Sequence, residues 1–424
     1  MRKIHNIAQL FFQKKQLKET FWAYLAKGIF LFSGLFFLYI IPKQLGVDHF
    51  GKFTLLQSYI SLLQLFFGTV LFSGIKKELI EYKFNQKSLL YFSQLIRLCF
   101  ILFIAASLIF LIITSFVNIP VLSDYRFYFL GLMLVTILCD LLMLLFLNTH
   151  RIFFITIMYF FKYGVKVILI VLLILTQRFT FSSLIIIFII GYMFSALVGI
   201  FLATTQFENW SIAHILKGDK KVINKILYRT KFLGLSSISS LLSGRSDAII
   251  LSFLVPLDIL GYYSIAAEIT RKAIMITQPM VMGVIPLIAH TKNKIFLLKK
   301  SIKQLMSINL LLMIGFLAFG KILIILLYGT DYQLSVNLLY ILSATPLIII
   351  MEGFFSNLQV LNDDNKAILI ITISRLILNP IISVLLIIVF GVYGAAIAYL
   401  LIGLLGLLAS WLRVKKIYFN DTAR

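Results

Sequence analysis

Long apolar runs recur along the whole chain, and they constrain the fold more than any other feature. A run of about 18 or more apolar residues can cross the hydrocarbon core of a bilayer as one helix. Hydrophobic residues make up 61% of the chain and charged residues only 13%, whereas a soluble protein is about one quarter charged. The alternating segments of about ten residues that are typical of an outer-membrane barrel are absent from the sequence. The sequence therefore predicts an all-α membrane protein.

We expect twelve transmembrane spans, arranged as six and six around the largest polar break, residues 204–229. The spans lie near 21–41, 53–74, 89–116, 127–147, 153–175, 180–203, 230–254, 259–288, 304–327, 335–361, 367–390 and 392–412. This predicts an N-terminal lobe over 21–203 and a C-terminal lobe over 230–412. A basic amphipathic segment (1–20) precedes them and a basic tail (413–424) follows. Two halves with an even number of spans enter the membrane in the same orientation, as in parallel-repeat transporters.

The net charge of +23 is concentrated in alternate loops. If both termini are cytoplasmic, the cytoplasmic segments hold 25 Lys and Arg and the opposite loops hold four. An excess of basic residues in cytoplasmic loops is the usual orientation signal, and such loops also contact anionic lipid headgroups. We therefore predict a multi-pass protein with both termini in the cytoplasm and membrane lipids as partners. The basic charge does not indicate a nucleic-acid partner.

No catalytic or metal-binding motif occurs in the sequence. The only two cysteines, Cys99 and Cys139, both fall inside predicted spans, so we expect neither a disulfide nor a metal site. The common nucleophile and metalloprotease motifs are absent, and the predicted outer loops are too short to form an active site. We expect a transporter that is not an enzyme and needs no cofactor.

Two apolar segments on either side of a turn at Pro256–Gly261 are interrupted by ionisable residues. These are Arg245, Asp247, Glu268, Arg271 and Lys272. A charge at mid-membrane costs about 2.5–3.5 kcal/mol, so such residues face a partner or a water-filled cavity. Burial favours the neutral form of a carboxylate, and we predict that Asp247 or Glu268 carries a coupling ion, H⁺ or Na⁺. The alternative is a structural ion pair such as Glu268–Lys272, which has helical i,i+4 spacing.

Lys162 and Lys166 lie one helical turn apart in the middle of a predicted span. Like charges at this spacing repel, so either an acid from another helix or an anionic substrate in a cavity should compensate them. A surplus of Arg and Lys suits a phosphate group. We predict a cationic substrate cavity lined by Lys162, Lys166, Arg245, Arg271, Lys272 and Arg375.

Short blocks spread over nearly the whole chain carry a family resemblance. They are Ile41–Pro42, Leu45–Gly46, Phe50–Gly51, Arg245–Leu251, Leu260–Ser264, Pro286, Leu327–Gly329 with Tyr332, Asn379–Pro380 and Gly391–Ala396. In this order and spacing the chain resembles the Wzx-type polysaccharide flippases of the multidrug/oligosaccharidyl-lipid/polysaccharide (MATE-like) exporter superfamily.

The resemblance implies two six-helix lobes around a central cavity. It further implies a protein of the bacterial cytoplasmic membrane that moves an undecaprenyl-diphosphate-linked oligosaccharide between leaflets, driven by an ion gradient. A polysaccharide polymerase and a chain-length regulator become candidate partners. Three other functions stay open: a peptidoglycan-precursor flippase, a multidrug exporter and a polysaccharide polymerase. A multidrug exporter fits less well because it favours buried acids, whereas this chain has a surplus of basic residues. A polymerase fits less well because it needs a large outer loop, and the predicted outer loops are short.

Overall fold

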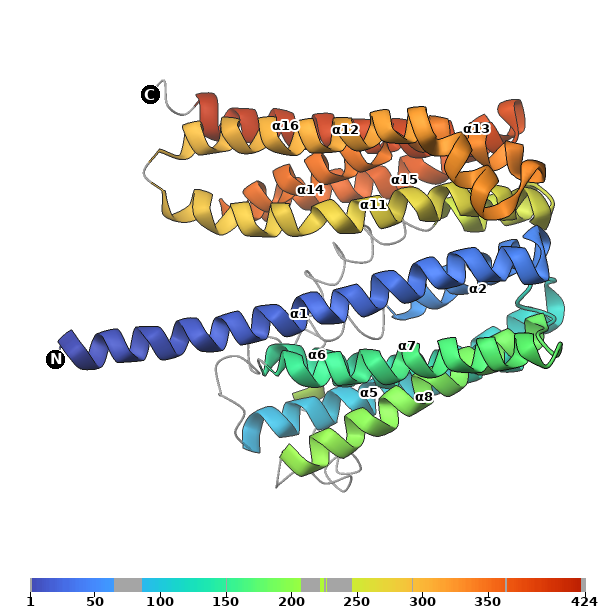
Figure 1. Cartoon of the computed structure of the whole chain (residues 1–424), viewed down its shortest axis with the longest axis horizontal. Helices are drawn as coiled ribbons and strands as arrows, with labels where there is room; N and C mark the ends of the chain where they lie inside the picture. Colours follow the sequence, from blue (N-terminus) through green and yellow to red (C-terminus); the bar gives the residue numbers. More distant parts are fainter. Residues whose placement is uncertain are drawn as a thin grey trace. The chain divides into compact units, whose positions relative to one another are not determined.

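The structure is a computed structural model in which the regular elements are helices (Figure 1). It describes the backbone of residues 2–64, 86–149, 151–206, 222–224, 226, 246–291, 293–362 and 364–420. No strand occurs in these ranges. The all-α class predicted from the sequence is confirmed.

The helices pack into two compact units, which we describe separately. Unit 1 comprises Met1–Phe37 and Ile60–Ser237, and unit 2 comprises Leu38–Tyr59 and Ile238–Arg424. The division falls inside the first helix, α1 (Arg2–Leu45), so the first part of this helix belongs to unit 1 and its last residues belong to unit 2. The lobe boundaries predicted from the sequence stay a prediction, and most of the polar break between the lobes lies outside the described residues.

Unit 1 is organised around α8, which packs against both α6 and α7. Its helices are the first part of α1, α5 (Gln86–Phe116), α6 (Arg126–Asn148), α7 (Ile152–Leu175) and α8 (Phe181–Gln206). The sequences of α6, α7 and α8 are almost continuously apolar and contain no proline. A helix satisfies all its backbone hydrogen bonds internally, as a bilayer interior demands.

Unit 2 has α14 and α16 at its centre. α16 packs against α14 and α15, while α11 packs against α13 and α14. The helices are α2 (Val47–Gln64), α11 (Leu257–His290), α12 (Lys294–Tyr328), α13 (Gln333–Leu342), α14 (Thr345–Leu361), α15 (Asn365–Phe390) and α16 (Val392–Lys415), with short helices η2 (Thr330–Tyr332) and η3 (Lys416–Asn420). Residues 246–254 form a further helical segment that leads into α11.

Nine helical segments among the described residues are long and apolar enough to cross a membrane. They are Phe21–Leu45, Phe92–Phe116, Arg126–Leu147, Ile152–Leu175, Phe181–Thr205, Lys294–Tyr328, Thr330–Leu361, Lys366–Phe390 and Val392–Phe419. The predicted second and seventh spans lie partly outside the described residues, and the eighth corresponds to α11. The 34 residues of α11 make a helix of about 50 Å, longer than a bilayer core of about 30 Å. The chain is a multi-pass membrane protein.

Two glycines let α2 and α11 touch backbone to backbone. A Cβ atom at Gly51 would collide with the carbonyl oxygen of Leu257, and one at Gly261 would collide with that of Val47. Small residues at helix interfaces allow this close approach in membranes. The contact brings α2 beside the polar segment of α11 that forms the site described next.

Candidate functional site

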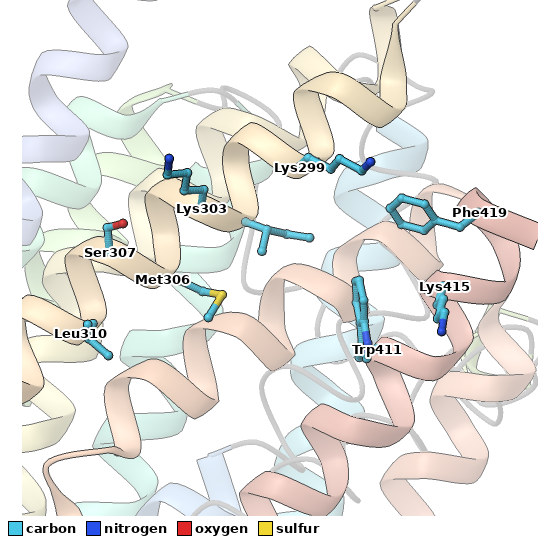
Figure 2. A pocket seen from close by; sticks show the side chains of 9 residues that line it. Lys299, Lys303, Met306, Ser307, Leu310, Trp411, Lys415 and Phe419 are labelled. Carbon is cyan, nitrogen blue, oxygen red and sulfur yellow. The ribbon is translucent and has the colours of Figure 1, made fainter.

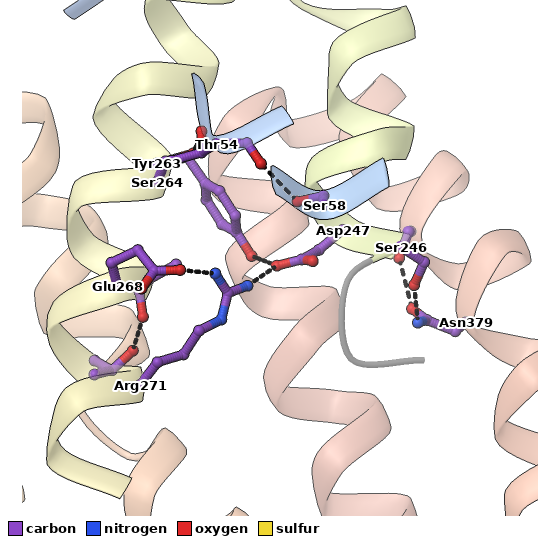
Figure 3. Close-up of polar contacts among 12 residues, drawn as sticks. Thr54, Ser58, Ser246, Asp247, Tyr263, Ser264, Glu268, Arg271 and Asn379 are labelled. Atoms are coloured by element: carbon purple, nitrogen blue, oxygen red, sulfur yellow. Dashed lines mark hydrogen bonds and ion pairs between the residues drawn. The ribbon is translucent and has the colours of Figure 1, made fainter. Parts of the chain in front are cut away.

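The charged residues of α11 form a network with the helical segment 246–254 (Figure 3). Asp247 accepts a hydrogen bond from the Tyr263 hydroxyl at 2.6 Å and forms an ion pair with Arg271 at 3.2 Å. Arg271 also donates to Glu268 at 2.9 Å. The Asp247 side chain is only 4% exposed, and its Oδ1 has no hydrogen-bond partner among the described residues. Two carboxylates thus share one guanidinium, and a carboxylate can bind a proton or a cation.

Hydrogen bonds connect this network to two other helices of unit 2 (Figure 3). Asn379 of α15 donates to the Ser246 hydroxyl at 2.6 Å and accepts from Ser383 at 3.0 Å. Thr54 of α2 donates to Ser264 of α11 at 2.9 Å. The polar residues of α2, α11, α15 and the segment 246–254 therefore form one connected region inside unit 2.

A cavity of about 300 Å³ lies between α14, α15 and α16. Its polar lining residues include Thr345, Glu352, Thr372, Arg375 and Asn379. Glu352 of α14 and Arg375 of α15 form an ion pair, with side chains 15% and 22% exposed. Since Asn379 lines the cavity and also bonds Ser246, the cavity and the Asp247 network share a wall.

The span that carries Glu352 is broken. Helix α13 ends at Leu342, a turn occupies Ser343 and Ala344, and α14 begins at Thr345. Proline at position 346 starts α14 without needing a hydrogen-bonded N–H. Backbone that departs from a regular helix at membrane depth occurs where it is buried or lines a cavity, and Thr345 does line one.

In unit 1, Lys162 and Lys166 lie buried on α7 and point at aromatic rings of α8. Lys162 is 5% exposed and Lys166 is 1% exposed. The Tyr192 ring centroid lies 4.2 Å from Lys162 Nζ and 3.9 Å from Lys166 Nζ, and the Phe188 centroid lies 4.0 Å from Lys166 Nζ. Tyr163 is near both, at 5.4 and 5.3 Å. Aromatic faces attract cations, so the rings around both lysines favour the presence of positive charge here, although burial opposes it.

One acid from another helix is close to these lysines. Asp140 of α6 interacts electrostatically with Lys162 and Lys166, but among the described residues neither lysine forms an ion pair with a carboxylate. Two basic side chains thus face one acid in the cluster of Asp140, Lys162 and Lys166.

Comparison with known proteins places the chain in a family. The model of the family described as "Polysaccharide biosynthesis protein" matches residues 16–292, more than half of the 424 residues. The chain belongs to this family. No curated protein sequence matches the chain.

Several solved structures share the fold of this chain. A structure described as lipid II flippase MurJ in an inward closed conformation is similar, with a TM-score of 0.74 and 15% identity, covering 94% of this chain and 87% of that one. An inward-facing multidrug resistance MATE family transporter of the MOP superfamily gives a TM-score of 0.69 and 14% identity, covering 94% of each chain. A MOP superfamily transporter from Pyrococcus furiosus, whose title reports a binding pocket of reverse polarity, gives 0.57 and 12%, covering 95% of this chain and 96% of that one.

These findings confirm the resemblance and the fold that the sequence indicated. The chain is a polysaccharide biosynthesis family member with a MATE-like fold. The particular substrate is a separate question.

The structure brings some predicted site residues together and leaves others apart. Asp247, Glu268 and Arg271 form one network, and Arg375 pairs with Glu352 in the adjoining cavity. Glu268 pairs with Arg271 at i,i+3, and Lys272 is half-buried one residue further along α11. Arg245 lies outside the described residues. The roles assigned to all of these residues stay predictions.

Several residues of the site were not predicted from the sequence. Tyr263, Tyr192 and Phe188 are aromatic residues in apolar runs and look like ordinary core. Asp140 and Glu352 stood out only as acids inside spans. Their positions next to basic residues depend on helix packing, for which the chain carries no local signal.

Proposed function

We propose that this protein is a flippase for an undecaprenyl-diphosphate-linked oligosaccharide unit and works by alternating access. The observation that carries the proposal is the pair Lys162 and Lys166, two basic side chains buried in a membrane-spanning helix with only Asp140 as a nearby acid among the described residues. A mobile diphosphate that visits in each cycle would supply the missing negative charge. Lysine binds phosphate as a point charge, and the family's role in polysaccharide biosynthesis favours a lipid-linked sugar as cargo.

In this proposal the lysines are covered until the substrate arrives. Lys166 is 1% exposed, so a phosphate reaches it only after Tyr192 has moved aside. The Tyr192 ring thus covers both amino groups in the absence of substrate.

The test is complementation of a strain that lacks its own polysaccharide flippase. The double variant Lys162→Gln/Lys166→Gln should insert normally, because it removes buried charge, and should fail to restore surface polysaccharide. A matched control, Lys321→Gln/Lys366→Gln, changes two exposed lysines and should complement fully. Expression is checked by immunoblot. If the well-expressed double variant of α7 restores surface polysaccharide, the lysines do not bind the substrate.

We also propose that Asp247 and Glu268 couple transport to a gradient of H⁺ or Na⁺. In support, Asp247 Oδ1 is buried with no hydrogen-bond partner among the described residues, and Asp247 and Glu268 both contact the same guanidinium. Asp247→Asn should abolish gradient-driven transport in vesicles and leave substrate binding within about threefold of wild type, a change below ~0.7 kcal/mol. If Asp247→Asn and Glu268→Gln both transport normally, neither acid carries the ion.

A peptidoglycan-precursor flippase is the second candidate. The observation in its favour is the fold similarity to a lipid II flippase. Complementation of a strain depleted of its lipid II flippase separates the two: growth there, without restored surface polysaccharide, would favour this alternative. A polysaccharide polymerase and a chain-length regulator remain proposed partners.

A further inference from the structure

A groove of about 660 Å³ opens between α12 and α16 of unit 2, away from the sites described above (Figure 2). It lies at the end of the unit where α12 begins and α16 ends. Lys299, Lys303 and Lys415 contribute its charged part. The rest of the lining is mainly apolar and includes Ile302, Met306, Leu310, Trp411 and Phe419. The groove is thus amphipathic.

The three lysines line the groove without an acid to balance them among the described residues. All three are exposed, and none forms an ion pair with a carboxylate among the described residues. Lys299 extends toward Phe419, with its Nζ 5.8 Å from the ring centroid. The three lysines are therefore available to an anion.

The apolar part of the groove continues along α12 in line with the lysines. Positions 299, 303, 306, 310, 314 and 317 recur at spacings of three and four and share one face of the helix. Met306, Leu310, Ile314 and Leu317 are 46%, 44%, 50% and 46% exposed. Figure 2 shows the start of this change, from Lys299 and Lys303 to Met306 and Leu310.

The length of this apolar face matches one leaflet. From Met306 to Leu317 the helix rises about 16 Å, and one leaflet contributes about half of a hydrocarbon core of ~30 Å. On the other wall, Lys415 and Trp411 are followed toward the membrane interior by the exposed Leu408 and Leu404. Both walls therefore have charge at one end and apolar side chains over the depth of an acyl chain.

We propose that this groove binds one anionic phospholipid, with its phosphate on Lys299, Lys303 and Lys415 and an acyl chain along α12. Basic pockets between transmembrane helices recognise anionic headgroups in this way. Trp411 lines the groove one helical turn before Lys415, and tryptophan is enriched where headgroups meet the acyl region. The inference does not depend on what the protein transports.

The experiment measures binding of fluorescent phosphatidylglycerol to the purified full-length protein in detergent, with phosphatidylcholine as the uncharged comparison. Each lysine near a membrane surface contributes about 1 kcal/mol to binding an anionic lipid. The variant Lys299→Gln/Lys303→Gln/Lys415→Gln should therefore bind phosphatidylglycerol about a hundredfold more weakly. The matched control Lys300→Gln/Lys366→Gln/Lys416→Gln removes three exposed lysines that do not line the groove, and it should bind as the wild type does.

Four outcomes would overturn the proposal. Equal losses in the two triple variants would show a general effect of surface charge. Equal binding of phosphatidylcholine and phosphatidylglycerol would show that the lysines do not select an anion. Tighter binding of undecaprenyl diphosphate than of phosphatidylglycerol, lost in the groove variant, would make the groove a site for the lipid-linked cargo instead. Competition by inorganic phosphate alone at equal affinity would likewise remove the role of the acyl chain.

Discussion

At the scale of single residues, Lys166 shows how a charge is accommodated inside a membrane unit. The centroids of Tyr192 and Phe188 lie 3.9 and 4.0 Å from its ammonium nitrogen. Each desolvated cation–π contact is worth up to about 2 kcal/mol, while a charge at mid-membrane costs about 2.5–3.5 kcal/mol. Two rings can therefore offset most of the cost of one lysine. The neighbouring Lys162 shares Tyr192, so the pair as a whole still attracts an anion.

The position of Lys166 depends on the glycine opposite it. A Cβ atom at Gly191 would lie 2.5 Å from Lys166 Cγ and 2.8 Å from the Lys162 carbonyl oxygen. Gly191→Ala should force the two helices apart, cost about 1–3 kcal/mol of stability, and lower transport by at least tenfold. Gly164→Ala is the control, because nothing lies within 4 Å of a Cβ there. Thermal unfolding and complementation measure the two effects, and similar behaviour of the two variants would contradict the tight packing at Gly191.

The sequence alone identified charged residues and not their surroundings. Lys162, Lys166, Asp247 and Arg271 stand out because a charge in an apolar run is visible without any knowledge of the fold. Their neighbours are harder to predict: Tyr192 lies 26 residues after Lys166, on another helix. Which aromatic residue faces which lysine is decided by the rotation of α8 against α7, and a continuously apolar helix does not reveal that rotation.

At the scale of elements, one ion pair joins α14 to α15. Both helices pack mainly on α16, and Glu352 and Arg375 connect them directly across the cavity. A Cβ atom at Gly406 of α16 would lie 2.8 Å from Glu352 and 3.0 Å from Arg375, so α16 passes close against the pair. The three helices meet at this point.

Replacing one partner of this ion pair should destabilise the protein more than replacing both partners. Glu352→Leu leaves Arg375 buried without its partner and should cost about 2–4 kcal/mol. The double variant Glu352→Leu/Arg375→Leu should recover most of that loss, since two apolar residues can pack where a buried pair stood. Thermal unfolding in detergent compares the three proteins. A double variant as unstable as the single one would mean that the pair itself, and not its desolvation cost, stabilises the α14–α15 contact.

At the scale of the whole molecule, the distribution of charge predicts the orientation in the membrane. The excess of 25 basic residues over four on opposite sides is a property of the entire chain, and no single loop carries it. It can be predicted from sequence because it does not depend on packing. The assignment of Leu38–Tyr59 to the C-terminal unit could not be predicted in this way, since we expected lobes to follow the order of the chain.

Single cysteines test this orientation in a background without Cys99 and Cys139. Asp258 and Lys366 are both exposed at ends of helices, and the charge distribution predicts them on opposite sides of the membrane. In intact cells an impermeant maleimide should label Asp258→Cys and not Lys366→Cys, and both should react after the membrane is permeabilised. Labelling of Lys366→Cys in intact cells would reverse the orientation.

The membership of Leu38–Tyr59 in unit 2 has a consequence for biosynthesis. This segment leaves the ribosome about 200 residues before its partners Leu257 and Ser264, which is roughly 10–40 s of synthesis at 5–20 residues per second. During that delay its hydroxyls have no tertiary partner in lipid. Thr54 donates to the carbonyl of its own helix at Phe50, 3.0 Å away, and Ser58 does so at Thr54, 2.8 Å away. The Thr54 and Ser58 hydroxyls can therefore stay hydrogen-bonded within their own helix until the C-terminal helices have been synthesised.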